Sequence, residues 1–332
     1  MANTDYFVAL TECHLLNEQS LAEMAYYPNF GRFWESVNTI MRVWCDRNIG
    51  EGSDMPRPTA TELIKYMDLT GMDVAFVLRE PGVLASHYET CMSTNSFIMQ
   101  QIEPYPERMY LECNCGPVLR RGVKNAIWEL EYLVKNRNAK LCKIYQPEDD
   151  GPLNDKRMWP FYEKCCELDI AVTIHTGTAY LPPLPERNTH PRLLDDILID
   201  FPDLKIIAYH MGWPETEVLI SLAGKHKNLY LSMSGIIGYY ARAPYRGYHA
   251  IGQALEWAGP DKLMLGCDLP FDELPRIVNF VRNLEMPEEL QEKWGYPVIT
   301  DEIRAKILGL NLAKLAKIKP TKRVNAARQH FR

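Results

Sequence analysis

A few polar side chains stand where short apolar runs of the sequence end, and their types suit a divalent metal ion. Glu12 and His14 follow the first run, two residues apart. On a strand, that spacing places both side chains on the same face. His175 and Asp268 follow two later runs. Two imidazoles and two carboxylates form a mixed nitrogen and oxygen set that suits Zn²⁺, Mn²⁺ or Fe²⁺, and suits neither Ca²⁺ nor copper–thiolate chemistry.

Each of these residues also has an ordinary structural interpretation. A single histidine at a strand end is often structural or solvated, and Asp268 could simply cap the helix that follows it. The metal site is therefore predicted from the joint pattern, and it requires a fold that brings distant strand ends together.

The apolar runs alternate with helical stretches along the whole chain. The predicted strands are Tyr6–Leu10, Asp73–Leu78, Met109–Cys113, Lys140–Tyr145, Ile170–His175, Lys205–His210, Leu229–Ser232 and Lys262–Asp268. The predicted helices include Thr59–Thr70, Gly122–Lys135, Lys156–Leu168, Arg192–Asp200, Pro214–Lys225 and Gly247–Gly259. The strands read as continuous apolar runs, as expected for a parallel sheet that is covered on both faces.

Eight strand–helix units favour the α/β class and a closed (β/α)8 TIM barrel. An open, doubly wound sheet is the alternative, but no GxGxxG motif follows the first predicted strand, which weighs against a dinucleotide site. In a closed barrel the carboxyl ends of all strands meet at one mouth, where the active sites of this fold lie. The candidate ligands would meet there.

Two segments fall outside the repeated unit. Residues 15–57, rich in Met, Trp and Tyr, predict a helical insertion after the first strand that acts as core cover or as a lid or wall of the site. Residues 286–317 predict helices that close the barrel base, and residues 318–332 form a basic tail, interpreted as solvated. No Pro/Gly/Ser-rich linker and no internal repeat divides the chain, so residues 1–332 are expected to form one domain.

Composition excludes several classes of protein. A formal net charge of −6 weighs against nucleic-acid binding, and no apolar run reaches the length of about 18 residues expected of a membrane span. No secretory signal is visible, and none of the nine cysteines lies in a C-x-x-C pair, so we expect a reduced, cytoplasmic chain with buried thiols. Cys113-x-Cys115 is a weak metal signal. The apolar content of residues 15–57 predicts a homodimer or a higher homo-oligomer.

Local sequence runs resemble the amidohydrolase superfamily, and within it the metal-dependent decarboxylases of aromatic and muconate-type acids. The resemblance spans most of the chain, from residue 6 to about 317. Its cues are VALTECH at Val8–His14, TELIKYMDLTGMDVAFV at Thr61–Val77, FPDLKIIAYHMG at Phe201–Gly212, GPDKLMLGCDLPF at Gly259–Phe271 and the LGLNLAKL stretch around Asn311. The Gly-x-Asp-x-Pro of the predicted eighth strand is the most specific cue.

The resemblance implies roles for single positions. Glu12, His14, His175 and Asp268 match the ligands of one divalent ion, with Zn²⁺ as the first expectation and Mn²⁺ or Fe²⁺ as alternatives. His210 matches a histidine that acts as acid–base or polarises bound water, and Asp268 is a second candidate for proton transfer. Leu269, where an aromatic residue is common, and Cys13 depart from the family pattern in ways that affect substrate shape.

Further residues are predicted to contact substrate. Lys143 would either bind the substrate anion, bridge a second metal as a carboxylated lysine, or form a structural ion pair. Arg79, after the second predicted strand, could neutralise the substrate acid, and Tyr239 and Arg242, after the seventh, could line the site.

The predicted function is decarboxylation of a small aromatic or enol-type carboxylic acid. Hydrolytic members usually open with His-x-His, whereas this chain has Glu-x-His, which favours the decarboxylases. The same metal could instead activate water, so a hydrolase of an amide, lactone or C–C bond, or a hydratase, remains an alternative. A non-catalytic barrel is a third hypothesis.

Overall fold

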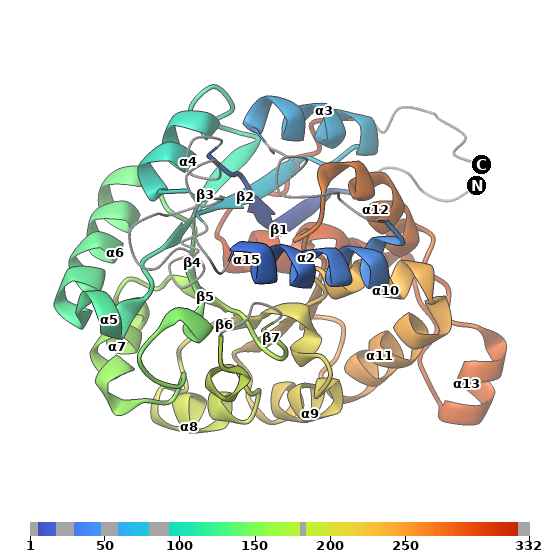
Figure 1. Cartoon of the computed structure of the whole chain (residues 1–332). Helices are drawn as coiled ribbons and strands as arrows, with labels where there is room; N and C mark the ends of the chain where they lie inside the picture. The colour runs from blue at the N-terminus through green and yellow to red at the C-terminus, as the bar shows by residue number, and fades with distance from the viewer. Residues whose placement is uncertain (1–5, 18–29, 48–58, 80–92, 180–183, 325–332) are drawn as a thin grey trace.

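Eight parallel strands in sequential order form the centre of the computed structural model, which describes residues 6–17, 30–47, 59–79, 93–179 and 184–324 (Figure 1). The strands are β1 (Ala9–His14), β2 (Val74–Leu78), β3 (Met109–Asn114), β4 (Leu141–Ile144), β5 (Ala171–Ile174), β6 (Ile206–Ala208), β7 (Leu229–Ser232) and β8 (Leu263–Met264). Each pairs in parallel with the next along the chain.

The sheet closes between its last and first strands. Thr11 forms a parallel bridge with Gly266, the Cys267 amide donates to the Thr11 carbonyl at 2.8 Å, and the Asp268 amide donates to the Glu12 carbonyl at 2.9 Å. A Cβ on Gly266 would lie 2.5 Å from the Cβ of Ser234, so only glycine permits this approach. The (β/α)8 prediction is confirmed, and the doubly wound alternative is wrong because the strand order never reverses.

Helices surround the barrel and join successive strands (Figure 1). They are α2 (Phe30–Cys45), α3 (Ala60–Thr70), α4 (Asn95–Ile102), α5 (Val118–Arg121), α6 (Val123–Arg137), α7 (Trp159–Glu167), α8 (Leu193–Asp200), α9 (Thr216–Lys225), α10 (Ile236–Arg242), α11 (Pro244–Trp257), α12 (Leu274–Arg282), α13 (Glu288–Trp294), α14 (Asp301–Ala305) and α15 (Asn311–Leu315). Short 3₁₀ turns are η2 (Gln146–Glu148), η3 (Lys156–Met158), η4 (Glu186–Asn188), η5 (Tyr209–Gly212) and η6 (Phe271–Glu273), and η7 (Lys306–Leu310) is a π-helical turn.

The strands nearest the site differ most from their predicted bounds. β1 begins at Ala9 rather than Tyr6, and it carries a bulge between Leu10 and Cys13. The predicted sixth and eighth strands stop early, at Ala208 and Met264. Beyond Ala208 the backbone turns at His210 and Met211, which have positive φ angles. Beyond Met264 the chain leaves the regular ladder but still pairs with β1 through Gly266, Cys267 and Asp268.

The predicted closing helices at the base are confirmed. Inward-facing strand residues at the amino end of the barrel, among them Ala9, Phe76 and Met264, form one buried cluster with Leu312 and Leu315 of α15. The outward faces of the strands pack against the helices in a second, larger cluster. Both faces of the sheet are therefore buried, which explains the continuous apolar runs.

Part of the basic tail lies against the barrel instead of in solvent. Lys322 Nζ donates to the Gly71 carbonyl at 2.8 Å, and the amides of Arg323 and Val324 donate to Asp73 Oδ1 at 2.5 and 3.1 Å. Asp73 is fully buried, so these donors compensate its charge. Within the described residues, the structure contains no helix that is both long and apolar enough to traverse a lipid bilayer.

Candidate metal centre at the barrel mouth

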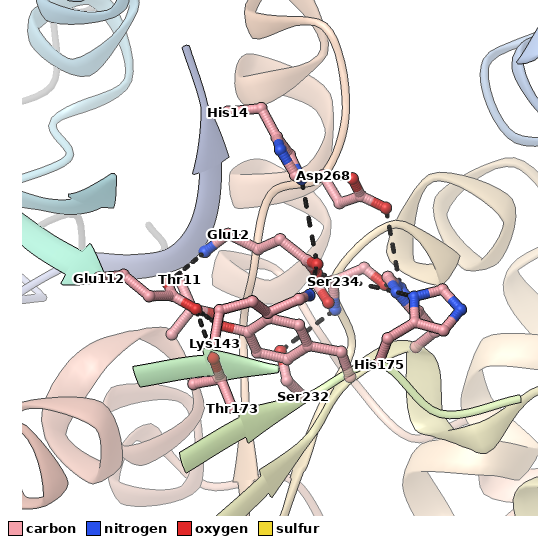
Figure 2. Close-up of polar contacts among 12 residues, drawn as sticks. Thr11, Glu12, His14, Glu112, Lys143, Thr173, His175, Ser232, Ser234 and Asp268 are labelled. Carbon is pink, nitrogen blue, oxygen red and sulfur yellow. Dashed lines mark hydrogen bonds and ion pairs between the residues drawn. The ribbon is translucent and has the colours of Figure 1, made fainter. Parts of the chain in front are cut away.

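Three of the four predicted metal ligands converge at the carboxyl ends of β1 and β8. His14 Nε2 lies 3.0 Å from Asp268 Oδ1 and 4.0 Å from Glu12 Oε1. One donor atom from each of the three residues lies within 4.8 Å of the other two. Figure 2 shows Glu12 between His14 above it and Lys143 and Glu112 below it. The bulge in β1 therefore does not separate Glu12 from His14.

Three of the predicted site residues have left-handed backbones. Glu12, His210 and Asp268 have φ angles of 56°, 60° and 52°. Such values are uncommon for residues with a Cβ and persist where the surrounding structure enforces them, often at functional sites. Glu12 lies at the bulge within β1, and His210 and Asp268 lie just beyond the ends of β6 and β8.

One oxygen of Glu12 suits the prediction of a bound cation. Glu12 is only 2% exposed, and its Oε2 atom has no hydrogen-bond partner among the described residues. A buried carboxylate oxygen normally accepts hydrogen bonds, because leaving it without a partner is costly. An oxygen of this kind, beside His14 and Asp268, fits the ligand set of a Zn²⁺, Mn²⁺ or Fe²⁺ ion.

The fourth predicted ligand, His175, lies beside this group and contacts it through His210. His175 Nδ1 is 2.9 Å from His210 Nε2, and His210 Nδ1 is 2.9 Å from the Ser234 carbonyl. His210 in turn lies 3.9 Å from Glu12 Oε2 and 3.8 Å from Asp268 Oδ2. His210 thus contacts His175 and lies within 3.9 Å of both carboxylates.

If both histidine rings are neutral, one of their three hydrogen-bond contacts lacks a proton. The other ring nitrogen of His175, Nε2, lies 3.2 Å from the Thr178 carbonyl. Two neutral imidazoles carry two N–H protons, whereas three protons are needed for this contact and the two described above. If His210 donates to Ser234 and His175 donates to His210, Nε2 of His175 keeps a free lone pair. This is the tautomer that a metal-binding histidine adopts.

Burial and neighbouring charges set the protonation of the cluster. Burial, then the adjacent His210 and Lys143, hold the pKa of His175 well below its usual value, so the ring stays neutral. For Asp268, burial would raise the pKa, but the hydrogen bond from His14 and the charges of His14, His210 and Lys143 lower it overall. Asp268 is therefore ionised at neutral pH, which makes it a good ligand and a poor acid.

A buried polar layer lies directly beneath Glu12, and Lys143 is the one member that the sequence analysis named. Lys143, on β4, forms an ion pair with Glu12 and lies 4.0 Å from the centre of the Tyr209 ring. Glu112, on β3, accepts hydrogen bonds from the hydroxyls of Thr173 and Tyr209 and from the Glu12 amide. Burial raises the pKa of Glu112. A carboxylate inside an apolar strand run gave the only sequence signal for this residue.

The position of Lys143 favours the structural ion pair among its three predicted roles. It is 1% exposed, and its ammonium group already contacts Glu12. A lysine that contacts a ligand carboxylate this closely compensates charge within the protein.

The predicted insertion places an aromatic side chain over the site. Helix α2 crosses the barrel in Figure 1, and the ring of Trp44 lies 6.3 Å from that of His210. Gly235 has a φ of 65°, and a Cβ there would lie 2.5 Å from the Trp44 ring and 3.0 Å from Asp268 Oδ2. The insertion therefore forms a wall of the site, and the sequence analysis did not single out Trp44 for this role. The rest of residues 15–57 lies partly outside the described residues.

The predicted substrate residues Arg79, Tyr239 and Arg242 do not join the cluster. Arg79 donates to the carbonyls of Asn114 and Gly116 at 2.8 and 3.1 Å. Arg242 is exposed and donates to the carbonyls of Arg42 and Val43, both at 2.8 Å. The Tyr239 ring faces the Arg246 guanidinium at 5.5 Å. The two predicted arginines hold neighbouring backbone segments.

Residues 66–316 match the amidohydrolase family, which is about three quarters of the chain. The chain belongs to the amidohydrolase family. A curated relative, 2-keto-4-carboxy-3-hexenedioate hydratase from Sphingobium sp. (strain NBRC 103272 / SYK-6), is 27% identical over 134 residues. That match covers 36% of this chain and 39% of the relative, so it spans about two fifths of the relative's length.

Solved structures extend the likeness of the amidohydrolase barrel to nearly the whole chain. An uncharacterised TIM-barrel protein from Bordetella bronchiseptica has a TM-score of 0.67 at 17% identity and covers 93% of this chain and 99% of its own. A 5-carboxyvanillate decarboxylase variant from Novosphingobium aromaticivorans, with bound manganese and 3-methoxy-4-hydroxy-5-nitrobenzoic acid, has a TM-score of 0.66 at 16% identity, with coverages of 95% and 98%. At these identities the likeness establishes the fold.

Proposed function

We propose that this amidohydrolase is a divalent-metal-dependent carboxy-lyase acting on a small aromatic or enol-type carboxylic acid. The observation that carries the proposal is the buried Oε2 of Glu12, which lies beside His14 and Asp268 and has no hydrogen-bond partner within the described part of the chain. The Glu-x-His sequence and the likeness to a manganese-containing decarboxylase structure support the choice of reaction. Glu12, His14, His175 and Asp268 would hold one ion, and Mn²⁺ joins Zn²⁺ as a leading candidate.

A bound divalent ion would supply Lewis acidity toward the carboxylate and a neighbouring oxygen of the substrate. Net decarboxylation adds a proton to the carbon that carries the carboxylate. The bond from that carbon to the carboxylate then breaks, its electron pair stays on the carbon skeleton, and CO₂ leaves. The protein must therefore deliver one proton to a carbon and exclude water from the site.

His210 is the proposed proton donor. Its ring lies between the two carboxylates and His175, and Trp44 covers it. Asp268, the second sequence candidate, has a lowered pKa and therefore holds no proton at neutral pH. We assign Asp268 to metal binding and His210 to proton transfer.

Matched asparagine variants of the two histidines test these roles. We expect His175→Asn to lose the metal ion, measured by elemental analysis of protein purified without added metal or chelator. His210→Asn should keep about one ion per chain and lose most turnover, by roughly 10²–10⁴-fold. If His210→Asn loses the metal while His175→Asn keeps it, the two assignments are reversed.

Product analysis separates the proposed reaction from its closest alternative. The hydratase relative supports a second candidate, in which the same residues activate water for addition to a double bond, and hydrolysis is a related outcome. Aromatic and enol-type acids should release CO₂. Their organic products should gain no oxygen from ¹⁸O-labelled water. Label in an organic product without CO₂ release would favour the hydratase or hydrolase. A chain that binds no metal on titration would support the non-catalytic alternative.

We further propose that residues 1–332 act as one catalytic unit that assembles into a homodimer or a higher homo-oligomer. Its small carboxylic acid substrate would bind under α2. Sedimentation velocity checks the oligomeric state.

A further inference from the structure

A second group of possible metal ligands lies outside the barrel mouth, between the barrel wall and its outer helices. The thiols of Cys113, Cys115 and Cys142 form a group in which every sulfur lies within 4.8 Å of the other two. All three residues are fully buried, and none forms a disulfide. The mouth site contains none of them.

Strand geometry brings the three sulfurs together. Cys113 on β3 and Cys142 on β4 are direct partners in the parallel ladder. Cys115 follows Cys113 by two residues, immediately after β3, and therefore returns to the same side. Their neighbours in sequence, Glu112 and Lys143, point to the barrel interior instead. The thiols thus occupy the outer layer, within the large apolar cluster.

The three thiols do not behave as isolated apolar groups. Hydrogen bonds from Cys113 and Cys142 lower the pKa of Cys115 to about 5, against the opposing effect of burial. The hydrogen bond with Cys115 and burial raise the pKa of Cys113, and hydrogen bonds with both partners raise that of Cys142. The close approach of the three thiols therefore favours the deprotonated form of Cys115, and metals bind the deprotonated sulfur.

We propose that Cys113, Cys115 and Cys142 bind a soft divalent cation of the Zn²⁺ type, independently of the catalytic ion. Thiolates select soft ions of this kind, and a Zn–S bond of about 2.3 Å requires sulfur–sulfur separations of about 4 Å. The present upper limit of 4.8 Å is within 1 Å of that value. No large backbone movement is needed.

Charge favours a divalent over a monovalent ion. Three thiolates around a divalent cation carry a net charge of −1, and around a monovalent cation −2, which is costlier to bury. The Arg121 guanidinium lies at the edge of the group, where it donates to the Cys115 carbonyl at 3.1 Å and pairs with Glu129. Arg121 lowers the pKa of Cys115, and the nearby Glu129 carboxylate raises it more strongly.

Cadmium titration of the metal-loaded enzyme tests the proposal. The accessible thiols of Cys45 and Cys166, and Cys91, which lies outside the described residues, are first replaced by serine. We expect a thiolate-to-cadmium charge-transfer band at about one Cd²⁺ per chain. The mouth site contributes no such band, because its ligands are imidazoles and carboxylates. A failure of the proposed decarboxylation therefore leaves this result unaffected.

Single variants in that background locate the band. Cys113→Ser and Cys142→Ser should each lose it, whereas Cys165→Ser, the matched buried cysteine outside the group, should keep it. The proposal is overturned if no band forms, or if the band survives both variants.

A second measurement on the unmodified chain guards against variants that fail to fold. With Cd²⁺ bound, alkylation in mild denaturant should be slowed on the peptides that contain residues 113, 115 and 142, as read by mass spectrometry. Equal alkylation with and without Cd²⁺ would refute the site. A disulfide between any two of the three cysteines in the native protein would also refute it.

Discussion

Two polar clusters inside the same barrel, one above the other, differ in how well their atoms are satisfied. The lower layer of Glu112, Thr173, Tyr209 and Lys143 is a dense hydrogen-bond and ion-pair network (Figure 2). The upper cluster around Glu12, by contrast, keeps a buried carboxylate oxygen that accepts no hydrogen bond from any residue the structure describes.

The backbone differs between the two levels in the same way. Glu112, Lys143 and Thr173 sit in regular parallel ladders, whereas Glu12 and Asp268 have left-handed φ angles. The lower layer is hydrogen-bonded within the protein, whereas the upper one combines left-handed backbone with a buried carboxylate oxygen that has no hydrogen-bond partner in the described chain. Both features are common at functional sites. Glu12 belongs to both, since Lys143 pairs with Oε1, whereas Oε2 has no hydrogen-bond partner among the described residues and lies 3.9 Å from His210.

The largest expected effect is on metal affinity. Matched carboxylate-to-amide substitutions, one in each level, should change that affinity by different amounts. Glu12→Gln removes a proposed ligand and should weaken metal affinity by more than about 100-fold. Glu112→Gln acts from outside the ligand set, so the loss should stay within the roughly 10–100-fold typical of such partners. Competition with a metal-binding dye measures both. Equal losses would show that the levels are not functionally distinct.

The next effect concerns stability rather than metal. Lys143→Met leaves Glu12 and Glu112 buried without their shared cation, which should lower the free energy of unfolding by about 3–5 kcal/mol. Urea unfolding of the metal-free protein measures it. A stable variant with a raised KM would instead return Lys143 to the predicted substrate-binding role. The surface substitution Lys135→Met is the control.

A smaller effect is expected at Arg242, which the sequence predicted to contact substrate and which lies outside the cluster at the barrel mouth. Arg242→Ala removes two hydrogen bonds to carbonyls at the end of α2, at an exposed position, and should cost about 1 kcal/mol in unfolding free energy. KM should change less than about twofold. A rise in KM above about 10-fold, absent in the control Arg42→Ala, would support direct substrate binding.

The smallest expected effect is a pH dependence of the metal-free protein. The pKa of His175 is lowered in the folded state, so the unfolded chain binds a proton first as the pH falls through about 6.5. Stability is therefore complete above that pH and declines below it, by on the order of 1 kcal/mol. Urea midpoints between pH 7 and 5 measure the decline. His175→Gln should flatten it, and an unchanged slope would contradict the assigned shift.

The sequence predicted the architecture well because its signal is local. Eight apolar runs separated by helices require a covered parallel sheet, and each predicted strand overlaps an observed one. The bounds of β1, β6 and β8 were less accurate, since β1 continues through a bulge beyond its apolar run, whereas the regular ladders of β6 and β8 stop before their apolar runs end. The pattern of apolar residues indicates which segments are buried, but it does not indicate where the backbone turns.

The sequence by itself determined that Glu12, His14 and Asp268 could share a site. Their residue types suit a metal ion, and a barrel brings the ends of its strands together. Only the tertiary structure decided which neighbours compete for them. Lys143 neutralises one side of Glu12, Glu112 supports it from below, and Trp44 covers His210. Those contacts join elements at least 100 residues apart in the sequence, and the bulge and left-handed turns near them leave no periodic trace in the sequence.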